Sequence, residues 1–257
     1  MENTEQNGLP PDFLYHYYSF KERNKTIFTK NQIYFQSPRE FNDPFDTTCK
    51  YILEGNEQKK KEFLLGLQSR HPKISTMDIN YVLSHPQREK EFLGKMENRD
   101  SIGRNAGIYC LTAKNDDILM WSHYADSLKG FCLKFSTKND FFVLAYKINY
   151  IKQRLIRNLL CLGGIEETKA LFLSKSDDWS YEEEYRCIIP DGVGKRTFPD
   201  NALVGVILGC KMEDSNKNKI IQWCYRRNHR PQLFTAVPKE SDYGLNIQPL
   251  EYPTKEI

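Results

Sequence analysis

A series of short β-prone runs, spread along nearly the whole 257-residue chain, constrains the fold more than any other sequence feature. Each run is apolar, β-branched or aromatic over about five or six positions, the length of an ordinary strand. Helices are expected between some of them, at 19–30, 117–125 and 216–227. The chain is therefore predicted to be an α+β protein. The expected strands lie at 13–18, 32–36, 107–111, 130–135, 146–150, 185–189, 204–208, 233–237 and 245–250.

Residues 55–100 are the least strand-like part of the chain. They are rich in Lys, Glu and Gln, and apolar residues such as Phe63, Leu64 and Leu67 recur at helical spacing. Two or three helices are expected here, inserted into the main domain. The polar start of the chain contains a Pro-Pro pair and predicts a flexible tail over residues 1–12, followed by a single α+β domain over residues 13–257.

The segment FNDPFD, residues 41–46, predicts a fixed turn. Asn42 and Asp43 can accept hydrogen bonds from their own backbone, while Pro44 stops any helix. We expect this turn to lie near the functional cleft.

Charge and cysteine content exclude several classes of protein. The 37 basic and 34 acidic residues are too evenly balanced for a dedicated nucleic-acid-coating surface. Seven scattered cysteines indicate reduced, buried thiols in the cytoplasm, and no histidine spacing predicts a metal site. The longest apolar stretch, 202–210, is too short to span a bilayer, so no membrane partner is expected.

Two aromatic segments contain candidate binding residues. In LYHYYS, His16 and Tyr17 lie near the start of the fold, although a lone histidine in an aromatic strand is more often a hydrogen-bonded core residue. In the run from 107 to 135, Trp121 and Tyr124 are three residues apart and share a helical face. Packing on a sheet explains these aromatics equally well as a clamp for a planar ligand, with Ser122 available for a hydrogen bond.

The segment WSYEEEYRCII places three consecutive glutamates before an apolar strand. In an extended backbone, Glu182, Glu184 and Arg186 point to one side, and Glu183 points to the other. An arginine beside two carboxylates would keep them ionised. The alternative is an exposed strand edge with ordinary surface ion pairs.

Taken together, LYHYYS, YFQSPREFNDPFD, LMWSHYADSLKGFCLKF and WSYEEEYR resemble a bacterial family known mainly as a domain of unknown function (number twenty-nine seventy-one). The resemblance runs from about residue 13 to residue 209. A more distant resemblance is to the ADP-ribosyltransferases of the His-Tyr-Glu type. It implies an ADP-ribosyltransferase-like core, a split antiparallel β-sheet that binds NAD in a cleft.

The second resemblance also implies roles for residues in this chain. His16 stands for the ribose-binding histidine, Tyr109 and Tyr124 for the tyrosines that stack on nicotinamide, and Glu184 for the catalytic glutamate. Glu182 completes a Glu-x-Glu arrangement and is the second catalytic candidate. The remaining candidates for NAD binding are Tyr17, Trp121, Ser122 and Arg186.

The implied activity is transfer of ADP-ribose from NAD, the substrate, to a protein or nucleic-acid acceptor, without a metal. Such a glycosyltransferase would act as a cytoplasmic toxin or antiphage effector, with an antitoxin or regulator as a further partner. The alternatives are a non-enzymatic nucleotide- or peptide-binding module and a nuclease. The enzyme requires His16, Tyr124 and Glu184 to converge on one cleft, and Glu184→Gln should then reduce NAD turnover with little change in stability.

Overall fold

The computed structural model describes residues 9–70, 75–97, 105–161 and 165–254. The chain divides into two compact units, each built from separate stretches of sequence. The first contains Met1–Ser37, Ala106–Ile148 and Ser180–Ile257, and the second contains Pro38–Asn105 and Asn149–Trp179. Helices and a large mixed sheet are both present, in agreement with the predicted α+β class. The two units are a finer division than the single domain that the sequence predicts.

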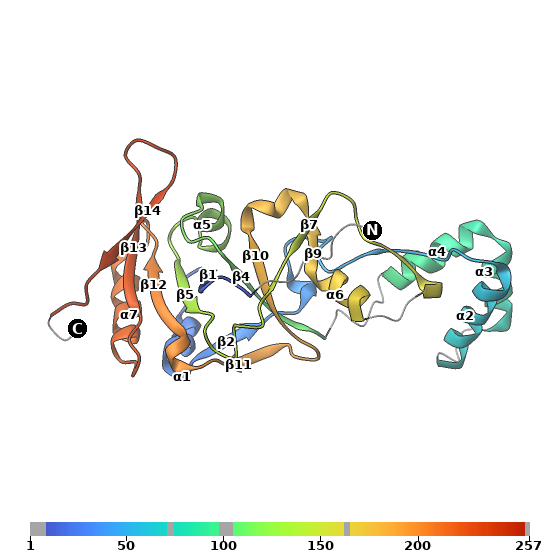
Figure 1. Cartoon of the computed structure of the whole chain (residues 1–257), viewed down its shortest axis with the longest axis horizontal. Coiled ribbons are helices and arrows are strands. Elements are labelled where there is room, and N and C mark those ends of the chain that lie inside the picture. The colour runs from blue at the N-terminus through green and yellow to red at the C-terminus, as the bar shows by residue number, and fades with distance from the viewer. Residues whose placement is uncertain (1–8, 71–74, 98–104, 162–164, 255–257) are drawn as a thin grey trace. The chain divides into compact units, whose positions relative to one another are not determined.

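An eight-stranded sheet lies in the first unit, in the order β14-β13-β12-β5-β1-β4-β10-β6. Figure 1 shows β13, β12 and β5 of this sheet next to one another. Neighbouring strands are antiparallel except β12 and β13, which are parallel and are connected through helix α7 (Asp214–Tyr225). β1 and β4 are central, so the site residues that they carry have strands on both sides. The strands are β1 (Phe13–Tyr18), β4 (Gly107–Thr112), β5 (Phe131–Ser136), β6 (Tyr146–Lys147), β10 (Glu184–Ile189), β12 (Leu203–Leu208), β13 (Gln232–Pro238) and β14 (Leu245–Leu250).

Both faces of this sheet are covered, because successive residues of its strands enter different apolar clusters. Leu14 of β1 belongs to one cluster together with Leu133 and Trp223, whereas Tyr15 and Tyr17 belong to a second cluster on the other face. Burial on both faces explains why these strands are apolar almost throughout rather than alternating. The first unit also contains the pair β2 (Gln32–Phe35) and β11 (Gly194–Thr197), and the helices α1 (Lys25–Lys30) and α5 (Ile118–Tyr124).

Helix α5 confirms the helix predicted at 117–125. Asp117 is its N-cap, and its carboxylate accepts hydrogen bonds from the backbone N–H groups of Leu119 and Met120. Side-chain caps of this kind satisfy donors that the first turn of a helix leaves unpaired. The predicted strand at 146–150 is wrong as one element: β6 pairs with β10, and β7 (Asn149–Ile151) belongs to the second unit.

The second unit confirms the helical prediction for the described part of 55–100. It contains α2 (Glu57–Arg70), α3 (Thr76–Ser84) and α4 (Pro86–Glu97), whose apolar side chains pack on one another around Leu64, Leu67 and Ile79. Residues 150–176 add elements that the sequence did not predict, namely a helix and short strands, and strands of three residues carry little pattern. These elements are β8 (Ile156–Asn158), paired with β3 (Lys50–Ile52), α6 (Ile165–Leu173), and β9 (Ser174–Ser176), paired with β7.

The FNDPFD segment forms the predicted turn. The Asp43 side chain is buried, and its Oδ1 accepts a hydrogen bond from the backbone N–H of Phe45 at 2.8 Å. This Asx-type bond orders the turn locally. The turn belongs to the second unit, and its relation to a functional cleft stays a prediction.

Most of the predicted tail, residues 1–8, lies outside the described residues. Pro11 and Asp12 are hydrogen-bonded through their carbonyl oxygens to Thr137. In the described stretches, no helix combines the length and apolar character needed to cross a membrane.

Candidate functional site

Strand register brings several of the predicted site residues to one face of the sheet. Glu184 is paired with Thr112, and Arg186 with Cys110, across the β10–β4 ladder. Thr112 is in turn paired with Tyr15 of β1. Because paired residues of antiparallel strands point to the same face, Glu184 and Arg186 lie on the face that carries Tyr15. We call the part of this face lined by Tyr124, Glu182, Glu184 and Arg186 the acidic face.

Glu182 is almost completely buried, with 3% of its surface exposed. The Tyr124 hydroxyl, from α5, donates to Glu182 Oε1 at 2.5 Å. The Thr112 hydroxyl, at the end of β4, donates to the Glu182 carbonyl oxygen at 2.5 Å. Both the side chain and the backbone of Glu182 are therefore held by neighbouring elements of the same unit.

Glu184 and Arg186 form a two-point ion pair within β10. Arg186 donates from Nε to Glu184 Oε1 at 2.6 Å and from Nη2 to Oε2 at 3.1 Å. The residues are 4% and 0% exposed. A guanidinium that meets a carboxylate in this way stabilises the ionised form. Both carboxylate oxygens of Glu184 are thus engaged with Arg186.

The inward position of Glu182 arises from a backbone kink, whereas that of Glu184 follows from the register of β10. Residues Asp177–Glu182 form a 3-10 helix, Glu183 has a left-handed φ of 43°, and the strand begins at Glu184. Glu183 is exposed, and its carboxylate pairs with Lys114 Nζ at 3.2 Å. The predicted division is confirmed, with Glu183 on the outside, but the predicted extended backbone at Glu182 is wrong.

The aromatic residues beside the acidic face are packed into the core. Trp121 is 0% exposed, and its indole N–H donates to the Asn115 carbonyl oxygen at 2.8 Å. Tyr17 meets Trp121 edge to face, with ring centroids 5.1 Å apart. The Ser122 hydroxyl donates to the Ile118 carbonyl oxygen of its own helix at 2.7 Å. In this conformation Trp121 supports α5 and presents no open ring face to a ligand.

His16 and Tyr109 lie on the opposite face of the sheet. His16 is paired with Leu133 of the first apolar cluster, to which Tyr109 also belongs. The His16 and Tyr109 rings are stacked at 4.4 Å with an interplanar angle of 15°. The ring centroids of Tyr18 and His16 are 4.4 Å apart. The Tyr18 hydroxyl oxygen lies 3.2 Å from the Tyr109 hydroxyl oxygen.

Burial keeps the His16 ring neutral. It lowers the pKa of His16 from 6.5 to about 4, although the hydrogen bond with the Cys110 carbonyl opposes the change. His16 Nδ1 lies 2.5 Å from that carbonyl oxygen, which can only accept, so the proton of the neutral ring is on Nδ1. His16 is therefore a neutral donor within an aromatic cluster at pH 7.

The structure thus brings Tyr124, Glu182, Glu184 and Arg186 together and separates them from His16 and Tyr109 by the sheet. Sequence reasoning missed Thr112 and Lys114, which hold the Glu182 backbone and the Glu183 side chain. Both follow the strand at 107–111, and pairing this strand with 185–189 would have pointed to them. Within the described ranges, no group of three or more His, Cys, Asp or Glu side chains is arranged to hold a metal ion.

The segment that contains the acidic face is also the one that matches a known family. A family model described as Protein of unknown function (DUF2971) matches residues 120–187. This match supports the predicted relation to that family over a shorter range than 13–209. It extends from Met120 in α5 to Cys187 in β10 and leaves His16 and Tyr109 outside. No curated protein and no solved structure matches the chain.

Proposed function

We propose that this protein is an NAD-dependent ADP-ribosyltransferase whose reacting carboxylate lies on the acidic face. The observation that supports the proposal is the placement of two buried carboxylates, Glu182 and Glu184, beside Tyr124 and Arg186. Cleavage of the bond between nicotinamide and ribose develops positive charge on the ribose. A fixed carboxylate in a water-poor site stabilises that charge in the transition state.

Glu182 fits the reacting role better than Glu184. Both oxygens of Glu184 receive hydrogen bonds from Arg186, so Glu184 is suited to positioning the end of β10. Glu182 Oε1 accepts a hydrogen bond from the Tyr124 hydroxyl, and a ribose hydroxyl can replace that hydroxyl as donor. Because Glu182 is 3% exposed, NAD can reach it only if the side chains that cover it move.

His16 and Tyr109 have no direct part in this proposal. The resemblance to the His-Tyr-Glu transferases assigns them ribose binding and nicotinamide stacking, but the sheet lies between them and Glu184. What remains of that resemblance is the order of the elements, with His16, Tyr109 and Glu184 on the adjacent strands β1, β4 and β10. The proposal includes the fold that this resemblance implies, in which the eight-stranded sheet corresponds to the split sheet of that superfamily.

The acceptor in this proposal is a protein or nucleic acid. A cytoplasmic role as a toxin or antiphage effector, controlled by an antitoxin or regulator, follows from the resemblance alone, since a fold-level likeness does not define a biological role.

A second candidate function is a nucleotide- or peptide-binding module without catalysis. Two observations favour it: His16 and Tyr109 face away from the glutamates, and Arg186 engages both oxygens of Glu184. An arrangement of this kind stabilises a fold without presenting a reactive group. The two functions differ in whether NAD is consumed.

The test is release of nicotinamide from NAD by the full-length chain, together with transfer of label from NAD to added protein or RNA. Glu182→Gln keeps the size of the side chain and an acceptor oxygen for Tyr124. It should lower nicotinamide release by about 100-fold or more, the effect of losing one electrostatic stabiliser. Glu183→Gln is the matched control, because it makes the same change at the adjacent exposed position, and it should retain wild-type release.

Equal release by the wild type and Glu182→Gln would refute the proposed mechanism. Binding of NAD in calorimetry without release by any form would instead identify a binding module. Glu184→Gln is a poor test, contrary to the expectation from sequence that it would leave stability unchanged. It removes the negative charge from the two-point ion pair with the fully buried Arg186, which should cost about 3 kcal/mol or more of folding free energy.

A further inference from the structure

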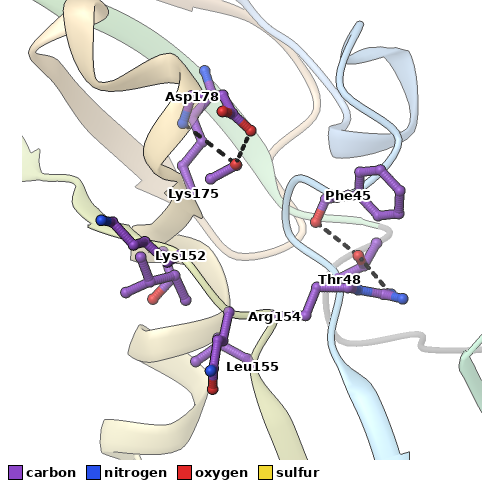
Figure 2. Close-up of a pocket in the computed structure, with 11 residues that line it drawn as sticks. Phe45, Thr48, Lys152, Arg154, Leu155, Lys175 and Asp178 are labelled. Carbon is purple, nitrogen blue, oxygen red and sulfur yellow. Dashed lines mark hydrogen bonds between the residues drawn. The ribbon is translucent and has the colours of Figure 1, made fainter.

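The second unit contains a pocket of about 220 Å³ whose lining carries more positive than negative charge. Three segments form it: the turn at Phe45 and Thr48, residues 151–155, and residues 174–178. Figure 2 shows Phe45 and Thr48 on one side of the opening and Lys175 and Asp178 on the other. The lining includes Lys152, Arg154 and Lys175, and the only carboxylate among the lining residues is that of Asp178. We propose that this pocket binds a phosphate group of a small-molecule ligand.

Arg154 is the residue best placed to bind the phosphate. Its Nη2 donates to the Thr48 hydroxyl oxygen at 3.2 Å, and its guanidinium lies 5.3 Å from the centre of the Phe45 ring. These two contacts restrain an otherwise exposed side chain. A guanidinium has five N–H donors, so most of them remain for a ligand. Its planar fork matches two oxygens of a phosphate group.

The two lysines contribute differently. Lys175 is 7% exposed, its ammonium group pairs with the Asp46 carboxylate at 3.9 Å, and it lies 5.1 Å from the centre of the Trp179 ring. Its charge is therefore balanced largely within the unit. Lys152 is exposed and makes no ion pair with any residue that the structure describes. Lys152 and Arg154 supply the net attraction for an anion.

Asp178 lowers the affinity of the pocket for an anion. The Ser176 hydroxyl donates to Asp178 Oδ2 at 2.9 Å, which fixes the carboxylate at the rim of the pocket. Its negative charge repels a phosphate group, so neutralising it should strengthen binding. The volume of about 220 Å³ is below the roughly 300–1,000 Å³ typical of pockets for drug-sized molecules. The pocket therefore suits one or two phosphate groups, with the rest of the ligand outside.

The test is calorimetric titration of the full-length chain with inorganic phosphate and with pyrophosphate at constant ionic strength. Lys152→Gln and Arg154→Gln should each weaken pyrophosphate binding by about threefold or more, as expected for loss of one charged contact at a partly exposed site. Asp178→Asn should tighten it. Lys61→Gln, which removes the same charge from an exposed position on α2 outside the pocket, is the matched control and should bind as the wild type does.

Four results would overturn the proposal: no pyrophosphate binding at millimolar concentration, equal weakening by Lys61→Gln, weaker binding by Asp178→Asn, or tighter binding of a competing single-stranded RNA. The first excludes the site and the second indicates unspecific attraction to the surface. Tighter binding of a short single-stranded RNA that competes with pyrophosphate would show that the pocket serves a macromolecular ligand and not a small molecule. Melting temperatures of all variants establish that each is folded. None of these measurements involves NAD turnover, so the proposal is tested independently of the acidic face.

Discussion

The neutral state of His16 predicts how the stability of the protein changes with pH. Burial lowers the pKa of this residue from 6.5 to about 4, so the unfolded chain takes up the proton at a higher pH than the folded chain does. The stabilising contribution is present above about pH 6.5, and it is lost as the pH falls towards 4. As the pH falls, protonation of His16 in the unfolded chain should therefore weaken the fold at a higher pH than the one at which the folded-state ring takes up its proton.

The two pKa values determine the size of the effect. The full difference between 6.5 and about 4 corresponds to about 3 kcal/mol of folding free energy. At pH 5 the unfolded chain is almost fully protonated at this position and the folded chain is mostly not. The linkage relation then gives a loss of about 2 kcal/mol between pH 7 and pH 5 from His16 alone.

The assay is urea denaturation of the wild type and of His16→Asn at pH 7 and pH 5. Carboxylates that titrate in this range contribute to both proteins and cancel in the comparison. The variant can still donate to the Cys110 carbonyl, but it loses the stacking on Tyr109 and should be less stable at both pH values. Its loss of stability between pH 7 and pH 5 should be smaller than that of the wild type by about 2 kcal/mol.

His123→Asn, at an exposed position of α5, is the control and should lose as much stability as the wild type does. The reasoning is refuted if the wild type and His16→Asn lose the same free energy of unfolding between the two pH values.

Two further predictions concern stability. Asp117→Ala removes the acceptor for the N–H groups of Leu119 and Met120, and thermal or urea denaturation should show a loss of about 1 kcal/mol in the free energy of unfolding. An unchanged free energy of unfolding would show that α5 does not depend on this side-chain cap. Gly130→Ala should be more costly, by about 1–3 kcal/mol, because its Cβ would lie 2.0 Å from the Tyr18 carbonyl oxygen. In the same assay Gly66→Ala, a helical position with no atom within 4 Å of the new Cβ, should stabilise by about 0.5–1 kcal/mol; a loss there as large as that at Gly130 would contradict the steric argument.

Local features of the fold could be predicted from the sequence because they depend on neighbours in the chain. Helix α5 with its capping Asp117 and the turn at Asp43 are of this kind. The helices of 57–97 follow from apolar spacing, and most strands of the large sheet follow from their apolar runs. The strand predicted at 146–150 was wrong because its two halves pair with different strands, β10 and β9, and the choice of partner is not a local property.

The sequence by itself determined which residue types the acidic segment offers, and that Glu183 differs in orientation from Glu182 and Glu184. Only the tertiary structure decided that His16 and Glu184 lie on opposite faces of one sheet. Alternation relates residues within a strand, but the register between β1, β4 and β10 relates residues of different strands, and no local pattern specifies it. The basic pocket has the same origin, because packing alone brings together residues near 45, 154 and 175.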